Sequence, residues 1–184
     1  MRKRPVEAAV ASLLRSLGRD ARRERELRGT ARRVAHALVE DILDGYAKDP
    51  AKALGRRVPA GRRGDSLVAI RGIAFHSICP HHLLPWRGTL DLVYRPEKWL
   101  AGFSGLVKLV DCRAHRLVLQ EEITLVVAED LVRLLGAKGA AVRIEAEQTC
   151  MIVRGPKRAG TRVVSVHVTG ELGRAEALAA LGGR

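Results

Sequence analysis

Two cysteines and one histidine are the residues of this sequence best suited to chemistry. Cys79 and His82 lie three residues apart in Cys79-Pro80-His81-His82, so a tight turn can direct both side chains to one point, and Cys150 can supply a third ligand. Two thiolates and one imidazole suit zinc, and three protein ligands leave a fourth position open for water. A water bound there becomes a nucleophile near neutral pH. We therefore predict a Zn²⁺ site formed by Cys79, His82 and Cys150, with His81 beside it to move protons.

The same residues also have simpler interpretations. A cysteine is often a small buried hydrophobic residue, which is the role that we expect for Cys112. A Cys-x-x-His pair alone is weak support for a metal, because structural zinc usually has four protein ligands. His81 could be recruited as the fourth ligand, although adjacent His81 and His82 side chains are poorly placed to chelate one ion. A basic binding module with structural zinc is therefore one alternative function.

The composition indicates one domain with a terminal extension. The chain has 184 residues, of which 47% are hydrophobic but only 3% aromatic, so its core must consist mostly of aliphatic side chains. No apolar run is long enough to cross a membrane, and the basic N-terminus lacks the apolar stretch of a secretory signal. Three cysteines cannot all pair within the chain, and a thiol metal site needs reduced sulfur. We therefore expect a cytoplasmic protein without a membrane partner.

The net charge of +13 is concentrated near the N-terminus. Residues 1–33 hold eleven Lys and Arg against four Asp and Glu, a net charge of +7. A second basic cluster contains Lys52, Arg56, Arg57, Arg62 and Arg63. Nucleic-acid binding would fit this charge, but six aromatic residues offer few stacking partners for bases, and no familiar nucleic-acid module is present. We do not expect nucleic-acid binding; a solvated basic face, or attraction of a small anionic substrate, is the better interpretation.

Hydrophobic periodicity and turn residues predict the elements along the chain. Helices are expected over 6–18, 30–45 with Thr30 as the N-cap, 104–115 and 119–135, with a short helix near the C-terminus. Strands are expected over 66–78, 87–95, 140–153 and 161–171, and a helical turn followed by a loop over 47–65.

The order β-β-α-α-β-β within 66–171 predicts an α+β fold, an antiparallel sheet with helices on one face. Such a sheet has exposed edges, which pairing in an oligomer would cover. We divide the chain into a basic N-terminal helical extension (1–29), an N-terminal helix and loop (30–65), the main domain (66–172) and a C-terminal tail (173–184).

Five motifs, in order, resemble those of one enzyme family. They are Thr30-Ala31-Arg32-Arg33-Val34-Ala35, Cys79-Pro80-His81-His82-Leu83-Leu84-Pro85, Gly102-Phe103-Ser104, Gln120-Glu121 and Cys150-Met151-Ile152-Val153-Arg154-Gly155. Over about residues 28–172 the sequence is similar to the GTP cyclohydrolase I family. The resemblance implies a tunnelling fold whose sheets join into a barrel. It also implies a homo-oligomer, a decamer of two pentameric rings with active sites between subunits.

The resemblance further implies a reaction on GTP. The family opens the imidazole ring of GTP at C8, releases formate and rearranges the ribose to give 7,8-dihydroneopterin triphosphate, which feeds folate or other pteridine synthesis. The predicted ligand trio would hold Zn²⁺, whose water attacks C8, and His81 would donate and accept protons at the ring. Glu121 would accept hydrogen bonds from the guanine N1–H and 2-amino group, with Gln120 contributing through its backbone.

The resemblance also assigns residues to the triphosphate. Ser104 would begin a helix, where free backbone amides favour phosphate, and Arg154 and Lys108 would clamp the phosphate groups. Taken alone, these residues have plainer roles. Ser104 would be a helix cap, Arg154 a surface charge, and Glu121 an acidic residue that complements the helix dipole.

Three positions depart from the family pattern. Gln148 stands two residues before Cys150, where the family usually has a histidine that transfers protons during ring opening, and glutamine exchanges no proton at neutral pH. Gly105 replaces a lysine, and Pro80 replaces a glutamate that the family often has. Losing a general acid–base costs about 10²–10⁴ in rate. An alternative function is therefore an enzyme, with Gln148 in its catalytic set, that stops at a ring-opened formamidopyrimidine nucleotide or uses another purine nucleotide.

Overall fold

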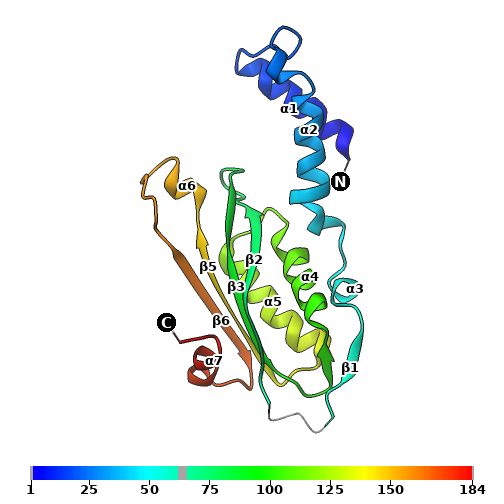
Figure 1. Ribbon diagram of the computed structural model, residues 1–184, viewed down its shortest axis with the longest axis vertical. Coiled ribbons are helices and arrows are strands. Elements are labelled where there is room, and N and C mark those ends of the chain that lie inside the picture. Colours follow the sequence, from blue (N-terminus) through cyan, green and yellow to red (C-terminus); the bar gives the residue numbers. More distant parts are fainter. Residues whose placement is uncertain (1, 62–65, 184) are drawn as a thin grey trace.

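The computed structural model of the protein describes residues 2–61 and 66–183, so Arg62 and Arg63 of the second basic cluster lie outside the described residues (Figure 1). Its helices and strands include the predicted ones, in the predicted order, together with short elements that the sequence did not indicate. They are α1 (Lys3–Ser16), α2 (Thr30–His36), α3 (Pro50–Leu54), β1 (Arg57–Pro59), β2 (Val68–Ile78), β3 (Pro85–Arg95), β4 (Trp99–Ala101), α4 (Phe103–Ala114), α5 (Gln120–Leu135), β5 (Gly139–Glu147), α6 (Thr149–Ile152), β6 (Val163–Gly170) and α7 (Arg174–Ala180).

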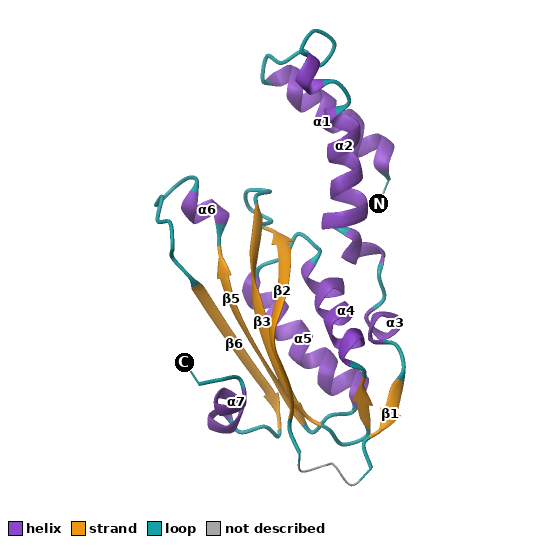
Figure 2. Ribbon diagram, in the orientation of Figure 1, coloured by secondary structure: helices purple, strands orange, loops and turns teal. Residues whose placement is uncertain are grey.

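Four long strands form one antiparallel sheet in the order β2-β3-β5-β6. Helices α4 and α5 lie side by side across one face of this sheet, and α7 lies against the other face near one end (Figure 2). The main core between the sheet and α4–α5 is aliphatic, as the composition requires, with Leu90, Leu106, Leu131 and Ile144 among its fully buried side chains. The predicted α+β fold, with an antiparallel sheet and β-β-α-α-β-β order, is confirmed.

The N-terminal part of the chain forms a helical arm, residues 3–47, that projects from the sheet layer (Figure 1). Helix α1 packs along α2, which continues into a π-helical segment (Ala37–Ile42) and a short 3-10 turn (Asp44–Ala47). The prediction that Thr30 caps the second helix is wrong, because Gly29 at φ 73° is the N-cap and Thr30 is the first helical residue. A glycine can adopt this left-handed conformation at no steric cost. Gly29 therefore separates the 3-10 turn Arg25–Leu27 from α2.

Two further boundaries differ from the sequence-based expectation. The predicted strand over 140–153 ends at Glu147, and the residues after it form the helical turn α6. The loop expected within 47–65 contains the short strand β1, which pairs with β4 in a separate two-stranded sheet. A strand as short as β1 forms only because it pairs with a distant segment. The pattern of apolar residues within 47–65 cannot reveal that pairing. None of the helices within the described residues is both long and apolar enough to cross a membrane.

Candidate active site

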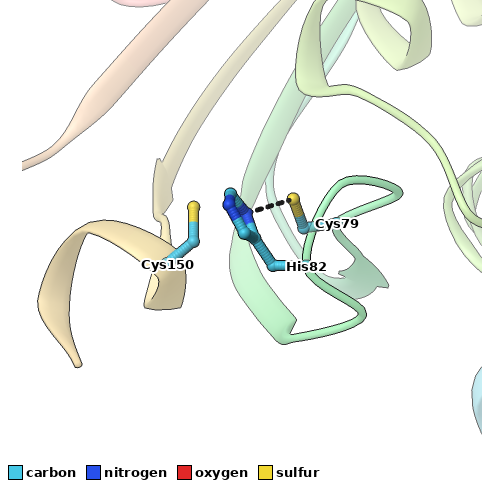
Figure 3. Close-up of side chains that lie close together, drawn as sticks. All are labelled: Cys79, His82 and Cys150. Carbon is cyan, nitrogen blue, oxygen red and sulfur yellow. Dashed lines mark hydrogen bonds between the residues drawn. The ribbon is translucent and has the colours of Figure 1, made fainter. Parts of the chain in front are cut away.

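The two cysteines and the histidine that were predicted as metal ligands meet at one end of the sheet. One ligand atom from each of Cys79, His82 and Cys150 lies within 4.8 Å of the other two. Cys79 and His82 belong to the loop that follows β2, Cys150 belongs to α6, and the three side chains point toward one another (Figure 3). The sequence predicted that a tight turn directs Cys79 and His82 to one point, where Cys150 joins them from another element. The structure confirms that the three side chains lie together.

Backbone hydrogen bonds explain the shape of the Cys79 loop. The Cys79 amide donates to the carbonyl of Leu84 at 2.9 Å, and the Leu83 amide donates to the carbonyl of Cys79 at 2.9 Å. Leu83 adopts a left-handed conformation with φ 53°, which reverses the chain toward Pro85 and β3. On the other side, Ile78 pairs with Leu117 in a parallel bridge. The ligand loop is therefore supported from both β3 and the connection between α4 and α5.

The distance between Cys79 and His82 fits two ligands of one tetrahedral zinc ion. With Zn–S of about 2.3 Å and Zn–N of about 2.0 Å, a sulfur and a nitrogen on one tetrahedral ion should lie about 3.5 Å apart. The Cys79 Sγ and His82 Nδ1 atoms are 3.5 Å apart. The Cys79 side chain is buried, and burial together with the nearby Cys79 sulfur raises the pKa of Cys150. Metal binding must therefore displace thiol protons, as it does at other thiolate sites.

The neighbouring histidine is not part of the ligand group. The rings of His81 and His82 are nearly perpendicular, with centroids 6.1 Å apart. His81 instead lines a pocket of about 220 Å³ beside the ligands, together with Glu121 and Gln148. Within the described residues, the group of closely spaced potential ligands contains three members. This arrangement leaves a coordination position without a protein ligand and disfavours the interpretation as a closed structural zinc site.

The start of α5 contributes two predicted residues to the same pocket. Gln120 and Glu121 occupy the first turn of the helix, Gln120 buried and Glu121 exposed. The buried Gln120 Nε2 donates to the carbonyls of Ile144, at 3.3 Å, and Val163, at 2.9 Å. Its Oε1 accepts a hydrogen bond of 2.8 Å from Gln148 Nε2. The side chain of Gln120 therefore positions Gln148, a role that sequence reasoning missed when it assigned Gln120 only a backbone contribution.

The predicted phosphate residues divide into two groups. Arg154 lies beside the ligand loop, where its Nη1 is 2.6 Å from His82 Nε2. Ser104 lies in the first turn of α4, whereas the last turn of α4 leads to Leu117 and the Cys79 loop. At about 1.5 Å per residue, about 15 Å of helix separates Ser104 from that end. Lys108 lines a different pocket of about 420 Å³, beside the arm and α3. One copy of the chain therefore does not bring Ser104 and Lys108 into the pocket that contains Cys79.

Gly105, which departs from the family pattern, is buried against α3. A Cβ atom placed on Gly105 would lie 2.1 Å from the carbonyl oxygen of Leu54, closer than any real contact. Helix α3 therefore approaches α4 too closely for a side chain at this position. A lysine at position 105 would require α3 to move. The close packing of α3 on α4 therefore accounts for the absence of a positively charged, phosphate-binding side chain at this position.

Residues that sequence reasoning left without a role connect the arm to the site. His115 is buried, its Nδ1 lies 2.7 Å from Asp44 Oδ1, and its ring stacks on His76 at 4.1 Å. Arg116 Nη2 donates to the Gly45 carbonyl at 2.8 Å. These pairs are 39 to 71 residues apart in the sequence, so no local pattern could have indicated them. They attach the arm to the segment that also holds the Cys79 loop.

Comparisons with known proteins identify relatives of this chain. A family model described as GTP cyclohydrolase I matches residues 6–181. The chain is 41% identical over 165 residues to "GTP cyclohydrolase 1" of Ralstonia nicotianae, covering 90% of this chain and 78% of that protein. It is 39% identical over 167 residues to "GTP cyclohydrolase 1" of Brucella anthropi, covering 91% of this chain and 78% of that protein.

Among solved structures, the chain resembles the archaeosine synthase QueF-Like in the apo form. That likeness has 19% identity and a TM-score of 0.49, and it covers 59% of this chain and 97% of the other. The family match extends over nearly the whole sequence and includes the arm, the ligand loop and α6. The chain therefore belongs to the GTP cyclohydrolase I family.

Proposed function

We propose that the protein is a zinc-dependent hydrolase that converts GTP into 7,8-dihydroneopterin triphosphate and formate. One observation carries the proposal: Cys79 and Cys150 of the Cys79–His82–Cys150 group line one pocket with the acidic residue Glu121, in a chain of this family. The relatives named GTP cyclohydrolase 1 support GTP as the substrate. The product would enter folate or other pteridine synthesis.

The residues of the pocket have complementary roles in this proposal. Zinc bound by Cys79, His82 and Cys150 would supply Lewis-acid chemistry for hydrolysis at C8 of the purine. The exposed carboxylate of Glu121 can accept two adjacent N–H donors, as guanine offers at N1 and its 2-amino group. His81 lines the pocket without joining the ligand group, so it remains free to donate and accept protons at the opening ring.

A homo-oligomer would complete the phosphate part of the site. Because Ser104 and Lys108 line other surfaces of the same chain, we infer that a second copy contributes them, together with Arg154 of the first, in an assembly such as the decamer that we expect. Mixing an inactive Lys108→Ala variant with an inactive Glu121→Ala variant tests this. Subunits that share sites should recover part of the activity after dissociation and reassembly, whereas self-contained sites should recover none.

Reduced thiols are part of the proposal. Cys79 and Cys150 have to remain thiols to bind metal, which fits a reducing compartment such as the cytoplasm. The test is to load the protein with zinc, add GTP, and follow formate, pterin fluorescence and product mass. Cys150→Ala should abolish both metal binding and turnover, whereas Cys112→Ala, which removes a buried thiol outside the site, should retain both. Turnover in metal-free Cys150→Ala would contradict the proposal.

A second candidate function follows from the environment of Gln148. Its amide is held by Gln120 where the family usually has a proton-transferring histidine, so the group at this position exchanges no proton. In this alternative, the enzyme adds one water to GTP and releases the ring-opened formamidopyrimidine nucleotide. The product would then have the mass of GTP plus one water molecule, and neither formate nor pterin would appear. Gln148→His should restore formate release, and an unchanged product would contradict this alternative.

The remaining alternatives have less support. A purine nucleotide other than GTP can be tested by supplying ITP and ATP in the same assay. Turnover faster with ITP than with GTP would identify a site that does not use the 2-amino group. A basic module with structural zinc would lose metal when His81 is replaced by alanine, whereas the proposed hydrolase would keep its metal and lose turnover.

A further inference from the structure

The connection between α4 and α5 supports the chain immediately before Cys79. The hydroxyl of the buried Ser77 and the amide of Ile78 both donate to the carbonyl of Arg116, at 3.2 and 3.4 Å. The parallel bridge between Ile78 and Leu117 extends this pairing by one residue. Cys79 directly follows Ile78, so a displacement of Arg116 would be transmitted to the first residue of the ligand group.

The side chain of Arg116 attaches this connection to two other elements. Its Nε donates to the carbonyl of Cys112, in the last turn of α4, at 2.9 Å, and its Nη2 donates to the carbonyl of Gly45, in the 3-10 turn at the base of the arm, at 2.8 Å. The guanidinium also lies over the Tyr46 ring, 5.6 Å from the ring centroid, and the Tyr46 hydroxyl accepts a hydrogen bond of 3.2 Å from the Leu117 amide. A planar guanidinium can make these contacts together because its N–H groups point in fixed directions. Arg116 therefore holds the arm, the end of α4 and the chain before the ligand loop in one arrangement.

The arm docks this closely because position 45 is a glycine. Gly45 is buried, and a Cβ atom placed on it would lie 2.7 Å from the carbonyl oxygens of both Cys112 and His115. These oxygens belong to the backbone, so they cannot rotate away from a side chain. A methyl group at position 45 would therefore push the arm away from the end of α4 and from the guanidinium of Arg116.

We propose that Arg116 is a positioning residue for the metal centre, and that the docked arm is part of the support of the Cys79 loop. Arg116 is not one of the three closely spaced potential ligands, and it acts on them through the backbone of Ser77 and Ile78. When the loop opens, its ligands separate, so the apparent metal affinity falls with the fraction of protein whose loop is closed. The effect on zinc rests on the proposed function, whereas the support of the loop by Arg116 does not.

The first test compares the zinc affinities of two arginine variants by competition with a chromophoric chelator. Arg116→Met removes both guanidinium hydrogen bonds and keeps the aliphatic chain. Arg113→Met is the matched control, because Arg113 also lies in the last turn of α4 but pairs with the buried Asp130 of α5, at 2.7 Å, and not with the arm. Arg116→Met should bind zinc about three- to tenfold more weakly than the wild type, the range of one net hydrogen bond, and Arg113→Met should bind it as the wild type does. Equal weakening in both variants would reflect general destabilisation and would overturn the proposal, as would wild-type affinity in Arg116→Met.

The second test separates docking of the arm from loss of the arginine. Gly45→Ala leaves Arg116 in place and displaces the arm, so it should weaken zinc binding by a similar factor. Gly18→Ala is the control within the arm, because a Cβ at position 18 meets no atom within 4 Å. Cobalt(II) bound in place of zinc should show an altered sulfur-to-metal absorption band in Gly45→Ala and in Arg116→Met, because Cys79 moves, and an unaltered band in Gly18→Ala. Wild-type zinc affinity and cobalt spectrum in Gly45→Ala would contradict the part assigned to the arm.

Hydrogen exchange measures the support of the loop in protein without metal. The amides of Cys79 and Leu83 donate within the ligand loop, and they should exchange faster in Arg116→Met and Gly45→Ala than in the wild type and Arg113→Met. Unchanged exchange of these amides would refute the role of Arg116. Wild-type protein that binds no zinc would instead contradict the proposed function, and the exchange rates would still decide whether Arg116 supports the loop.

Discussion

Replacing Gln120 by methionine tests how the site holds Gln148. The Gln120 side chain is 3% exposed and takes part in three hydrogen bonds, to Ile144 O, Val163 O and Gln148 Nε2. Because a backbone carbonyl only accepts, Gln120 must direct its NH₂ group at Ile144 and Val163 and its oxygen at Gln148. This fixes the orientation of the Gln148 amide as well. Methionine keeps the length of the side chain and removes every polar contact.

The magnitude follows from counting these bonds. Each contributes about 1 kcal/mol net, so Gln120→Met should lower the free energy of unfolding by about 2–3 kcal/mol. Gln148→Met breaks only the shared bond but leaves the buried Gln120 oxygen without a donor, which costs about 1–2 kcal/mol. The shared bond is lost in either variant. The double variant should therefore lose about 1 kcal/mol less than the sum of the two single losses.

Urea denaturation at one fixed protein concentration measures the coupling, because an oligomer's apparent stability depends on concentration. The same four proteins should be compared for turnover of GTP. If Gln120 acts through Gln148, its replacement lowers turnover in the wild type and has no further effect in the Gln148→Met background. Additive losses of both stability and turnover would refute the reasoning and would make Gln120 an ordinary core residue.

Three further changes probe the surroundings of the site. Gly105→Ala places a Cβ 2.1 Å from the Leu54 carbonyl oxygen, so thermal unfolding should show a loss of about 1–2 kcal/mol despite the better helix propensity of alanine. Burial and the nearby His115 lower the pKa of His76 from its ordinary value of 6.5, an effect that neighbouring carboxylates only partly oppose. Below about pH 6.5 the unfolded chain binds a proton at His76 more readily than the folded chain does, so the free energy of unfolding falls as the pH falls. The free energy of unfolding of His76→Gln, measured by denaturation, should therefore depend less on pH between pH 7 and about 5 than that of the wild type. Asp44→Asn weakens the contact with His115, and proteolysis in the arm should become faster than in the wild type while the sheet stays intact.

The elements of the sheet layer were predictable because their patterns are local. The stretches that became β2, α4 and α5 each bury one face, whereas β3 is buried on both faces from Leu90 to Tyr94 and β6 is only partly buried. Gly136 ends α5 in the left-handed conformation that glycine favours. The pairing of β1 with β4, and of Asp44 with His115, depends on segments distant in sequence. The strand expected over 140–153 was too long because Val and Ile continue after Glu147, where α6 forms instead. Tertiary contacts override propensity there, including the hydrogen bond from Thr149 Oγ1 to the Pro85 carbonyl.

The ligand trio was predictable for a related reason. Cys79 and His82 lie in one turn, so their spacing alone places them together, whereas Cys150 was assigned to the group from its residue type and from the family resemblance. Spacing carries no such information about Arg154, whose contact with His82 spans 72 residues. Nor does it show that Gln120 holds Gln148, because that contact depends on how α5 meets the end of β5.

Two of the departures from the family pattern fit their surroundings rather than disrupt them. Gln148 donates to the Gln120 oxygen, a bond that an imidazole N–H at the same position could also make. Gly105 allows α3 to lie directly on α4. The two differ in what they imply for chemistry. Gly105 sets the packing of helices outside the pocket, so a lysine there would cost stability first. Gln148 lines the pocket itself. A histidine at this position could donate one ring N–H to the Gln120 oxygen, and its other ring nitrogen could then exchange a proton with the substrate.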